Sequence, residues 1–324
     1  MKIVALNNDP VLNEAFQEFA GKHRLFFNST AWLKNYDKQQ LKQCLILNNN
    51  SDIIGCFIYY VFKKAFFTFI ISPPFTPGID LFYINPSDSI VGKNSFNKDV
   101  QEALVTYFET QHAAFINLNL PFHIIDTQPF IWKGYTSRTR YSYLIDLAHS
   151  EETLKNNLAS SKRRSLAKAE KDGLTIQETN DYQLVYSLIL QSLERNDVAK
   201  NKTILKNILF SFANSSNAIA FVAYRTNKAI GATFCLVNDQ KAIYLLGGFD
   251  ADNKHHGAGV SCMWQSILKA KQMGLNHFDF EGSMDQDIER YFRDFGGELT
   301  PYYSVEKINA LLKPLLHLKG HRSI

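Results

Sequence analysis

Cysteine and long apolar runs are scarce in this chain of 324 residues. The four cysteines lie far apart and form no CxxC pair, so we expect reduced, buried thiols and neither a disulfide framework nor a metal site. The most apolar stretch, residues 56–75, is interrupted by two lysines and two prolines and is therefore unable to span a membrane. The cysteines are Cys44, Cys56, Cys235 and Cys262.

A large excess of charge is also lacking. The net charge is +4, which fits poorly with strong, sequence-independent binding to a large polyanion. The first ten residues, MKIVALNNDP, contain one lysine but no apolar core of signal-peptide length, so we expect a cytoplasmic protein. With 45% apolar and 20% charged residues the composition is that of a globular protein, and the length suits two domains of about 150 residues.

What the sequence does contain is an internal repeat. Residues 44–70 align without a gap on residues 220–246, and Gly55 then falls on Gly231, each preceded by isoleucine. Each copy reads as three short strands separated by polar turns, which predicts an antiparallel meander. A helix-length segment, another strand and an aromatic-glycine element follow in both halves. We therefore predict an α/β (α+β) fold with two tandem domains, each a mixed, mostly antiparallel sheet flanked by helices.

The junction between the two halves has the features of a strand followed by a helix. Residues 141–147 alternate like a strand, and Ser150 followed by two glutamates is typical of a helix start. The helical stretch that begins there is predicted to end at Gly173. We place the first domain at residues 1–148 and the second at residues 149–324.

A basic stripe lies on this helical stretch. Its side chains at positions i, i+4 and i+7 share one helical face. Two interpretations remain open, a solvated surface and an anion-binding face. The stripe consists of Arg164, Lys168 and Lys171.

A glycine-rich segment follows the third strand of the second repeat. Residues 251–259, ADNKHHGAG, lead into a helix whose apolar positions recur from Val260 and which Gly274 ends. A loop that enters a helix N-terminus offers unpaired backbone N–H groups to a phosphate. The spacing is neither that of a dinucleotide fingerprint nor that of a nucleophile elbow. The adjacent His255 and His256 are poorly arranged to chelate one metal ion.

Two carboxylates follow in the next predicted strand. In residues 278–281, FDFE, the side chains alternate, so a strand would bury both phenylalanines and present Asp279 and Glu281 on the opposite face. Either acid is a candidate general base toward an amine, provided that burial or neighbouring charge raises its pKa. The alternative is a hydrogen-bonded acid that orders the turn. Ser283 is predicted to cap the following helix, with Gln286 reaching back.

Three segments together resemble the FemAB-type branch of the GNAT acyltransferase superfamily. They are KRRSLAKAEKDGL, HHGAGVSCMWQSILKAKQMGLNHFDFEGS and IERYFRDFGGE, whose order and spacing match over most of the chain. Tandem GNAT domains agree with the internal repeat. The resemblance implies that the third and later strands of a domain separate from each other. An acyl donor then lies in the gap between them, with its pyrophosphate at the N-terminus of the following helix.

The same resemblance implies the site residues. Residues 254–259 match the acyl-CoA signature, which is Gln or Arg, two residues, Gly, one residue and Gly or Ala, except for lysine at the first position. The RYFRDFGG element places Phe292 and Arg293 by the reaction centre, and FFNSTAWLKNY resembles an acceptor-binding segment. The catalytic candidates are Glu281, Arg293 and Asp279. The cofactor-binding candidates are Lys254, His256, Gly257, Ala258 and Gly259, and the substrate-binding candidates are Trp32, Lys34, Arg163, Arg164 and Phe292.

Two donors remain open, acyl-CoA and the aminoacyl-tRNA that FemAB-type enzymes commonly use to extend peptidoglycan precursors. The helical arm that such tRNA-dependent enzymes often carry is missing, because residues 181–212 suffice for only two helices. We expect no tightly bound cofactor, and the donor acts as a co-substrate. The expected partners are a small-molecule or lipid-linked amine acceptor and, with that donor, tRNA.

We therefore predict an N-acyltransferase that moves an acyl or aminoacyl group onto an amine of a cell-envelope or related metabolite. The alternative is a non-catalytic GNAT-like protein that binds a nucleotide-linked or RNA ligand, since the first half has SPPFTPG where the second has its glycine segment. The C-terminal INALLKPLLHLKGHRSI either docks to the inner face of the membrane or packs as an ordinary terminal helix.

Overall fold

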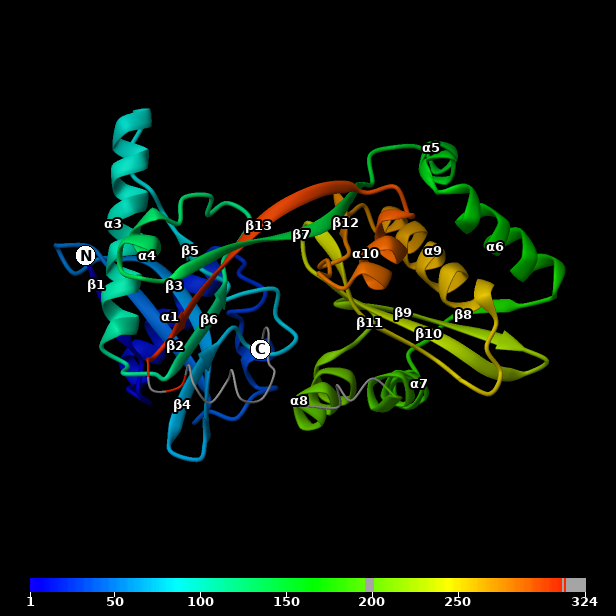
Figure 1. Cartoon of the computed structure of the whole chain (residues 1–324), viewed down its shortest axis with the longest axis horizontal. Helices are drawn as coiled ribbons and strands as arrows, with labels where there is room; N and C mark the ends of the chain where they lie inside the picture. The colour runs from blue at the N-terminus through cyan, green and yellow to red at the C-terminus, as the bar shows by residue number, and fades with distance from the viewer. Residues whose placement is uncertain (196–200, 311, 313–324) are drawn as a thin grey trace. The chain divides into compact units, whose positions relative to one another are not determined.

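The computed structural model describes residues 1–195, 201–310 and 312 of the chain (Figure 1). Its internal contacts divide the chain into two compact units. Unit 1 consists of Met1–Arg140 and the described residues from Pro301 on, and unit 2 of Tyr141–Thr300. The chain therefore returns to unit 1 after completing unit 2. The acceptor and donor roles expected of residues 1–148 and 149–324 stay predictions.

Unit 1 is built on a mostly antiparallel sheet. Its elements are β1 (Lys2–Ala5), α1 (Pro10–Lys22), α2 (Thr30–Leu33), β2 (Leu41–Leu47), β3 (Ile53–Lys64), β4 (Phe67–Ile71), β5 (Phe82–Tyr83), α3 (Ile90–Glu109), β6 (Phe115–Asn119), α4 (Gln128–Trp132), the start of β7 (Thr136–Asp146) and most of β13 (Glu298–Ile308). The strand order is β1-β2-β3-β4-β6-β13, with β5 paired to β3. Strands β4 and β6 run parallel, and the other strand pairs are antiparallel.

Helix α3 supplies much of the core of unit 1. Its fully buried Val100, Leu104 and Phe108 pack with sheet residues such as Phe57 and Leu118. The aromatic rings of Phe57 and Phe108 lie 5.9 Å apart. The apolar face of α3 thus covers the sheet.

Unit 2 repeats the same plan. Its elements are the end of β7, α5 (Glu151–Asn157), α6 (Ser160–Lys171), β8 (Thr175–Glu178), α7 (Tyr182–Arg195), α8 (Lys202–Asn207), a π-helical turn (Ile208–Phe212), β9 (Ala218–Arg225), β10 (Lys228–Val237), β11 (Lys241–Phe249), α9 (His256–Gln272), β12 (His277–Asp279), α10 (Gln286–Arg293) and the start of β13. The strand order is β7-β12-β11-β10-β9-β8. Strands β11 and β12 run parallel, and their neighbours are antiparallel.

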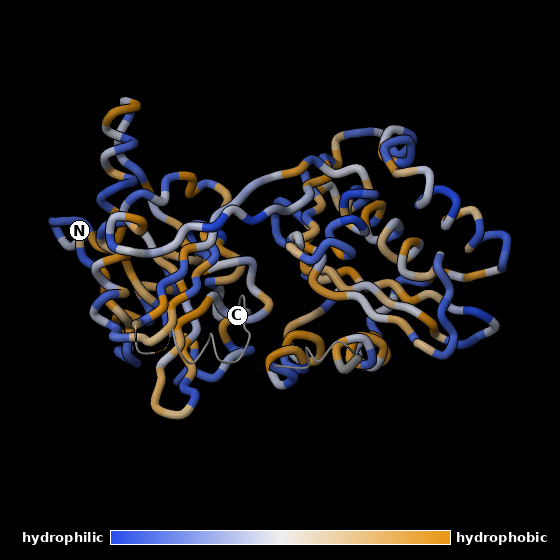
Figure 2. Tube along the Cα trace, viewed as in Figure 1, coloured by the Kyte–Doolittle hydropathy of each residue, from blue (hydrophilic) through white to orange (hydrophobic). Residues whose placement is uncertain are grey.

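Helices cover both faces of the sheet of unit 2, with α9 on one side and α7 on the other (Figure 1). The fully buried Cys262, Met263 and Ile267 of α9 pack into the core. Where α7 crosses β11, a side chain on Gly248 would lie 2.2 Å from the Leu188 carbonyl oxygen, so only glycine fits. Figure 2 shows the apolar meander strands beneath the polar α6.

The predicted repeat is confirmed as two antiparallel meanders, β2-β3-β4 and β9-β10-β11. The register of β2 against β3 shifts at Ile54, and that of β9 against β10 shifts at Ile230. In each meander the isoleucine before the repeated glycine is therefore the extra residue of a β-bulge. The shared Ile-Gly pair marks this irregularity.

Two helix boundaries differ from the prediction. The single helical stretch after Ser150 is two helices, because Leu158 adopts an extended conformation and is buried, and α6 begins afresh at Ser160. Helix α10 is capped by Asp285 rather than by Ser283, since the Asp285 carboxylate accepts from the second and third residues of the helix. The smaller Ser283 hydroxyl instead accepts from the Asp285 N–H.

Three other predictions hold. The four cysteines are reduced and buried, and Ser150 caps α5. The described part of residues 181–212 forms two helical segments, α7 with 14 residues and α8 with the π-helical turn that follows it directly. None of the described helices is both long and apolar enough to cross a membrane. The membrane-docking prediction for the C-terminus falls on residues 308–324, most of which lie outside the described part of the chain.

Candidate functional site

Strands β11 and β12, the parallel pair of unit 2, separate after a short paired stretch. Strands β11 and β12 pair at three positions, from Lys241 with His277 to Ile243 with Asp279. Beyond Ile243, β11 continues to its end along β10 alone in the described part of the chain. A register shift leaves Leu245 as the extra residue of a bulge just past the point of separation. The strands thus diverge as the sequence resemblance implies.

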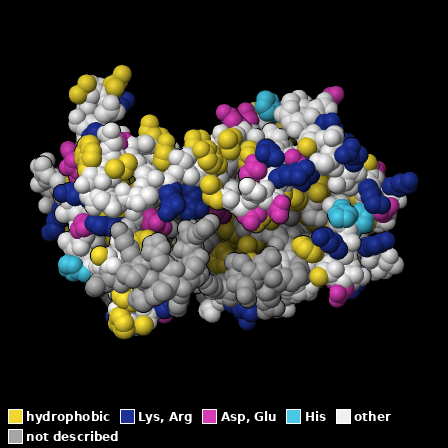
Figure 3. All heavy atoms as spheres, viewed as in Figure 1, with side chains coloured by type: hydrophobic (Ala, Val, Ile, Leu, Met, Phe, Trp, Pro, Cys, Tyr) yellow, Lys and Arg dark blue, Asp and Glu magenta, His cyan; other side chains and the backbone are white. Residues whose placement is uncertain are grey.

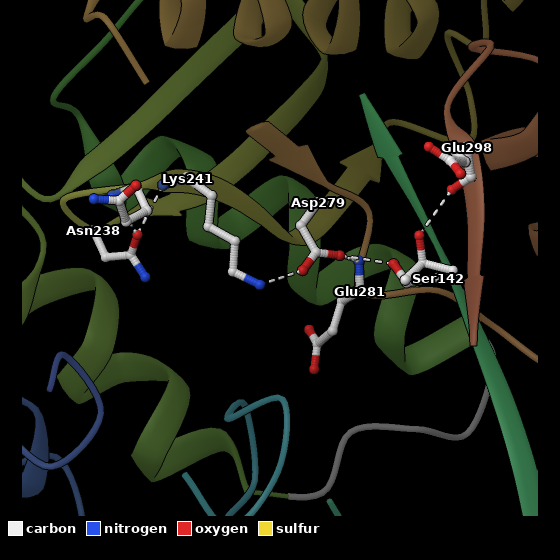
Figure 4. A network of polar contacts seen from close by, with 8 residues as sticks. Ser142, Asn238, Lys241, Asp279, Glu281 and Glu298 are labelled. Atoms are coloured by element: carbon white, nitrogen blue, oxygen red, sulfur yellow. Dashed lines mark hydrogen bonds and ion pairs between the residues drawn. The ribbon is translucent and has the colours of Figure 1, made fainter. Parts of the chain in front are cut away.

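A carboxylate network lies where β12 ends (Figure 4). The side chain of Asp279 is 1% exposed, and its carboxylate accepts from the Ser142 hydroxyl at 2.7 Å and from the Glu281 N–H at 2.8 Å. The ammonium group of Lys241 lies 2.5 Å from the other carboxylate oxygen. Because both oxygens are engaged, Asp279 orders the turn, which is the alternative interpretation of this acid.

Glu281 has a different environment. It is half-buried, and its carboxylate makes no hydrogen bond or ion pair among the described residues. Burial first, and then the negative charge of Asp279, raise the pKa of Glu281 to about 7, while Lys241 acts in the opposite direction. A carboxyl group with this pKa can accept a proton near neutrality.

The backbone at Glu281 is unusual. Its φ angle is 57°, a left-handed conformation that is costly for a residue other than glycine, asparagine or aspartate. The next residue, Gly282, has a φ of 75° and approaches the Tyr141 carbonyl so closely that a side chain would overlap it. The strand therefore ends before Glu281, and the prediction that both acids extend from one strand face is wrong.

Helix α9 begins earlier than predicted. Because its first residue is His256, Gly257, Ala258 and Gly259 lie in the first helical turn rather than in a loop. The Nδ1 atom of His255 accepts from the Gly257 N–H at 3.0 Å, so this backbone donor is already engaged.

The capping histidine is itself held by a neighbouring acid. The Nε2 atom of His255 lies 2.9 Å from Asp172, at the end of α6, and Lys168 also contacts this carboxylate. The hydrogen bond from Lys168 and then that from His255 lower the pKa of Asp172 to about 2. Since Nδ1 is the acceptor, Nε2 carries the proton and donates a hydrogen bond to the Asp172 carboxylate.

The glycines of α9 have different surroundings. A side chain at Gly257 would lie 2.7 Å from the Ser165 carbonyl oxygen of α6, so this glycine permits the two helices to pack. A side chain at Gly259 would meet only the Tyr291 hydroxyl, at 3.5 Å, which is ordinary contact. Gly259 therefore has room for at least a methyl group beside Tyr291.

Sequence reasoning missed Lys162 at this location. Its side chain is buried, and its ammonium group lies 3.7 Å from the ring centre of Tyr291 and 4.9 Å from that of Phe295. Burial lowers the pKa of Lys162 to about 8, with Asp294 opposing and Arg290 adding to the shift. The available signal was a lysine seven residues before the buried Ala169, on the inner face of α6.

The remaining candidates of unit 2 are spread over its surface and core. Phe292 is buried against Phe280 and Tyr244, at ring separations of 5.2 and 5.5 Å. Arg293 is exposed and pairs with Glu289 at 3.3 Å. Their proposed roles at the reaction centre stay predictions.

Four basic candidates have separate positions. Lys254 is exposed and lies 5.3 Å from the ring centre of Phe249, and His256 is exposed at the start of α9. Arg163 donates to the carbonyl groups of Asn156 and Leu158 at the end of α5. This end of a helix is favourable for a cation, so Arg163 has a structural role. The guanidinium group of Arg164 is exposed.

The candidates of unit 1 separate into a core residue and a surface residue. Trp32 is fully buried and donates to the Thr76 hydroxyl at 3.2 Å, so it contacts no solvent. Lys34 lines a cavity of about 730 Å³ together with two further lysines, Lys38 and Lys42. Amide side chains, including Asn13, provide much of the remaining polar wall.

The described residues contain no group of three or more histidine, cysteine or acidic side chains that could hold a metal ion. Burial raises the pKa of the Cys235 thiol to about 12 and that of Cys262 further. These thiols are therefore unsuited to act as nucleophiles or metal ligands near neutral pH.

Comparison with known proteins identifies the second half of the chain. The model of the acetyltransferase (GNAT) domain matches residues 156–293. This range contains α6, the parted strands, Glu281 and the start of α9. Among curated proteins no match is found.

Solved structures extend the likeness to the whole fold. FemX aligns over 98% of this chain and 99% of its own, with a TM-score of 0.63 and 12% identity. The C-terminal domain of a putative lysylphosphatidylglycerol synthetase from Agrobacterium fabrum aligns over 96% and 100%, with a TM-score of 0.56 and 14% identity. A tandem GNAT protein from the clavulanic acid biosynthesis pathway aligns over 94% and 98%, with a TM-score of 0.53 and 9% identity. Residues 156–293 therefore form a GNAT acetyltransferase domain, and the chain as a whole shares the fold of FemX and of the tandem GNAT protein.

Proposed function

We propose that the protein is an N-acyltransferase whose reaction takes place in unit 2 beside Glu281. The observation that carries this proposal is a half-buried carboxyl group with a pKa of about 7 at the point where β11 and β12 part. Such a group is poised to accept a proton from an attacking amine. The match to the acetyltransferase domain supports acyl transfer as the reaction class.

The proposed reaction is direct transfer without a covalent enzyme intermediate. The amine nitrogen attacks the carbonyl carbon of the donor, the bond from this carbon to the leaving sulfur or oxygen breaks, and Glu281 takes the amine proton. The leaving group takes a proton from solvent. Backbone N–H groups on the edge of β11 beyond Ile243, which lacks a strand partner among the described residues, are suited to stabilise the oxyanion.

We propose that the donor lies along the start of α9. Gly259 leaves space there, and the buried Lys162 supplies a positive charge beside Tyr291. Because the Gly257 N–H is already held by His255, a phosphate at this position depends on the lysine and the remaining donors of the helix end rather than on a free glycine loop. This geometry favours acyl-CoA as the first donor to test, with aminoacyl-tRNA as the other.

The cavity of unit 1 supports an acceptor that carries an anionic group. Three lysines and several amides line it, and no acid is among its lining residues. A sugar phosphate or a nucleotide-linked metabolite with a free amine fits this chemistry. A lipid-linked or other cell-envelope acceptor, with cytoplasmic reaction at the membrane, stays part of this proposal.

The first experiment is calorimetric titration of the full chain with acetyl-CoA and with CoA. The same titration is repeated on Gly259→Trp and on Gly21→Trp, a control that adds indole to an exposed helix glycine with open space around it. We expect saturable binding that Gly259→Trp abolishes and Gly21→Trp leaves unchanged. Equal affinity in all three proteins would refute the donor site. No heat with millimolar ligand would refute acyl-CoA as donor and direct the search to aminoacyl-tRNA.

The second readout is the pH dependence of acyl transfer to a panel of amines. Because only ionised Glu281 accepts a proton, we expect kcat/KM to rise with pH through about 7 and then to level. Glu281→Gln should lower kcat by about 100-fold or more and remove this inflection while leaving donor affinity unchanged. Retained turnover in Glu281→Gln would contradict its role as base, and a chain that binds the donor without any turnover would favour the non-catalytic alternative.

A further inference from the structure

The turn between β3 and β4 presents an aromatic side chain to solvent. Phe66 is 85% exposed, more than any other large apolar side chain in the described part of the chain. Its ring lies 4.7 Å from that of Phe67, which is partly buried. Figure 1 shows this hairpin extending past the neighbouring strands of unit 1, and Figure 3 shows hydrophobic side chains at the same end of the unit.

Local turn chemistry does not account for this sequence. Lys64 pairs with Phe67, so Ala65 and Phe66 form a two-residue hairpin loop, and Ala65 has a φ of 54°. Glycine, asparagine and aspartate are the residues that such a turn favours, because they adopt this conformation at low cost. The chain instead has alanine and an exposed phenylalanine, so the tip has a backbone conformation and a surface that both oppose folding in water.

The charges around the tip are all of one sign. Residues 62–69, FKKAFFTF, contain two lysines and no acid. Lys64 faces the same side of the hairpin as its partner Phe67, whereas Lys63 pairs with Thr68 on the other side. Both lysines are exposed, and neither forms an ion pair or hydrogen bond among the described residues. An aromatic tip is therefore flanked by a free cation on each face.

We propose that the β3–β4 hairpin tip, residues 63–67, binds an anionic lipid surface. The phenyl ring of Phe66 enters the boundary between headgroups and acyl chains, and the two lysines extend to lipid phosphates on either side. Charge complementarity selects this occupant, because a neutral apolar partner would leave both ammonium groups without counter-charges. A single ring and two cations give weak, reversible binding. This proposal is independent of the acyl-transfer site.

The base of the hairpin is rigid enough to present the tip. Phe62 and Phe69 stack in parallel at 5.0 Å, and Phe69 belongs to a buried cluster with Phe115 and Leu312. Substitutions at the tip therefore leave the core of unit 1 unchanged. Variants at residues 63, 64 and 66 are expected to fold normally, which thermal unfolding verifies.

The test is co-sedimentation of the full chain with vesicles of phosphatidylcholine, either alone or mixed with phosphatidylglycerol. We expect binding to the anionic vesicles that weakens as salt is added, because the lysine contribution is screened. Phe66→Ser should lower the partition coefficient by about tenfold. The double substitution Lys63→Gln, Lys64→Gln should abolish the preference for anionic vesicles. Ile125→Ser, at another exposed apolar residue of unit 1, is the matched control and should bind as the wild type does.

Four results would overturn the proposal. The first is absence of binding to anionic vesicles, and the second is equal binding by wild type and Phe66→Ser. The third is a Phe66-dependent dimer in light scattering without vesicles, which would make a second copy of the chain the occupant. Free phosphate or glycerol phosphate that competes fully for binding would show that a soluble anion, and not a lipid surface, is recognised.

Discussion

At the scale of single residues, Glu281 combines a left-handed backbone conformation just after β12 with a raised pKa. Its folded pKa of about 7 lies above the ordinary value of 4.5, so folding favours the protonated form. This stabilisation is fully present below the ordinary pKa and is lost as pH rises through 7. A pKa difference of this size corresponds to at most about 3 kcal/mol.

We therefore expect Glu281→Gln, which mimics the protonated acid, to raise the unfolding temperature at pH 8 and to change it little at pH 4. Thermal unfolding followed by circular dichroism at the two pH values measures the difference. The exposed Glu298→Gln serves as the control and should show no such dependence. An equal effect of Glu281→Gln at both pH values would mean that the carboxyl group is not desolvated in solution.

The pKa of Lys162 is shifted in the opposite direction, downward. Its folded pKa of about 8 lies below the ordinary 10.5, so the stability of the wild type rises with pH between these values. We expect Lys162→Met to increase the unfolding free energy at pH 7 by about 1–2 kcal/mol, since loss of the cation–π contact offsets part of the gain. This advantage should shrink toward pH 10, and acyl-CoA affinity should fall. Lys171→Met, on the exposed side of α6, is the control and should alter neither the unfolding free energy nor the acyl-CoA affinity. A lower unfolding free energy of Lys162→Met at pH 7 would contradict this expectation.

At the scale of elements, the first turn of α9 contains two glycines with different functions. A side chain at Gly257 would overlap the backbone of α6, whereas one at Gly259 would fit beside Tyr291. We expect Gly257→Ala to destabilise the protein by about 1–3 kcal/mol, because α6 must move. Gly259→Ala should be neutral or stabilise the helix by about 0.5–1 kcal/mol. Urea denaturation of both variants measures the difference, and equal effects would show that α6 and α9 pack less closely than described.

The same elements show what periodicity can predict. The apolar positions from Val260 to Leu268 were sufficient to locate α9, and the shared Ile-Gly pair located both meanders. Local patterns fail where a side chain from elsewhere intervenes. The cap of α9 is a histidine held by Asp172 of another helix, and α5 and α6 are separated because Leu158 is buried in the core. Neither event leaves a periodic signal.

At the scale of the whole molecule, unit 1 is made of two segments of the chain, one before unit 2 and one after it. Strand β13 begins at the end of unit 2, yet its residues Ser304–Ile308 pair with β6 and place the fully buried Val305 in the core of unit 1. A charge at Val305 would therefore disturb a unit that is otherwise made by the first 140 residues.

We expect Val305→Asp to cost on the order of 4 kcal/mol and to remove hydrogen-exchange protection from β4 and β6. Leu299→Asp is the control, because Leu299 is 51% exposed on the same strand, and it should leave protection unchanged. Hydrogen exchange with mass spectrometry locates the effect. Loss of protection first in β9, β10 and β11 would show that β13 stabilises unit 2 instead.

The sequence by itself determined the tandem α/β fold, the two meanders and the burial of the four cysteines. These features follow from local periodicity and from residue types repeated in both halves. It also placed Glu281 among the catalytic candidates, although the strand face inferred for it was wrong. Only the tertiary structure decided that Asp279 is fully paired while Glu281 has a raised pKa, and that Lys162 lies beneath Tyr291. Burial and charge at these positions depend on residues distant in sequence, such as Ser142 and Lys241, and no local pattern encodes those contacts.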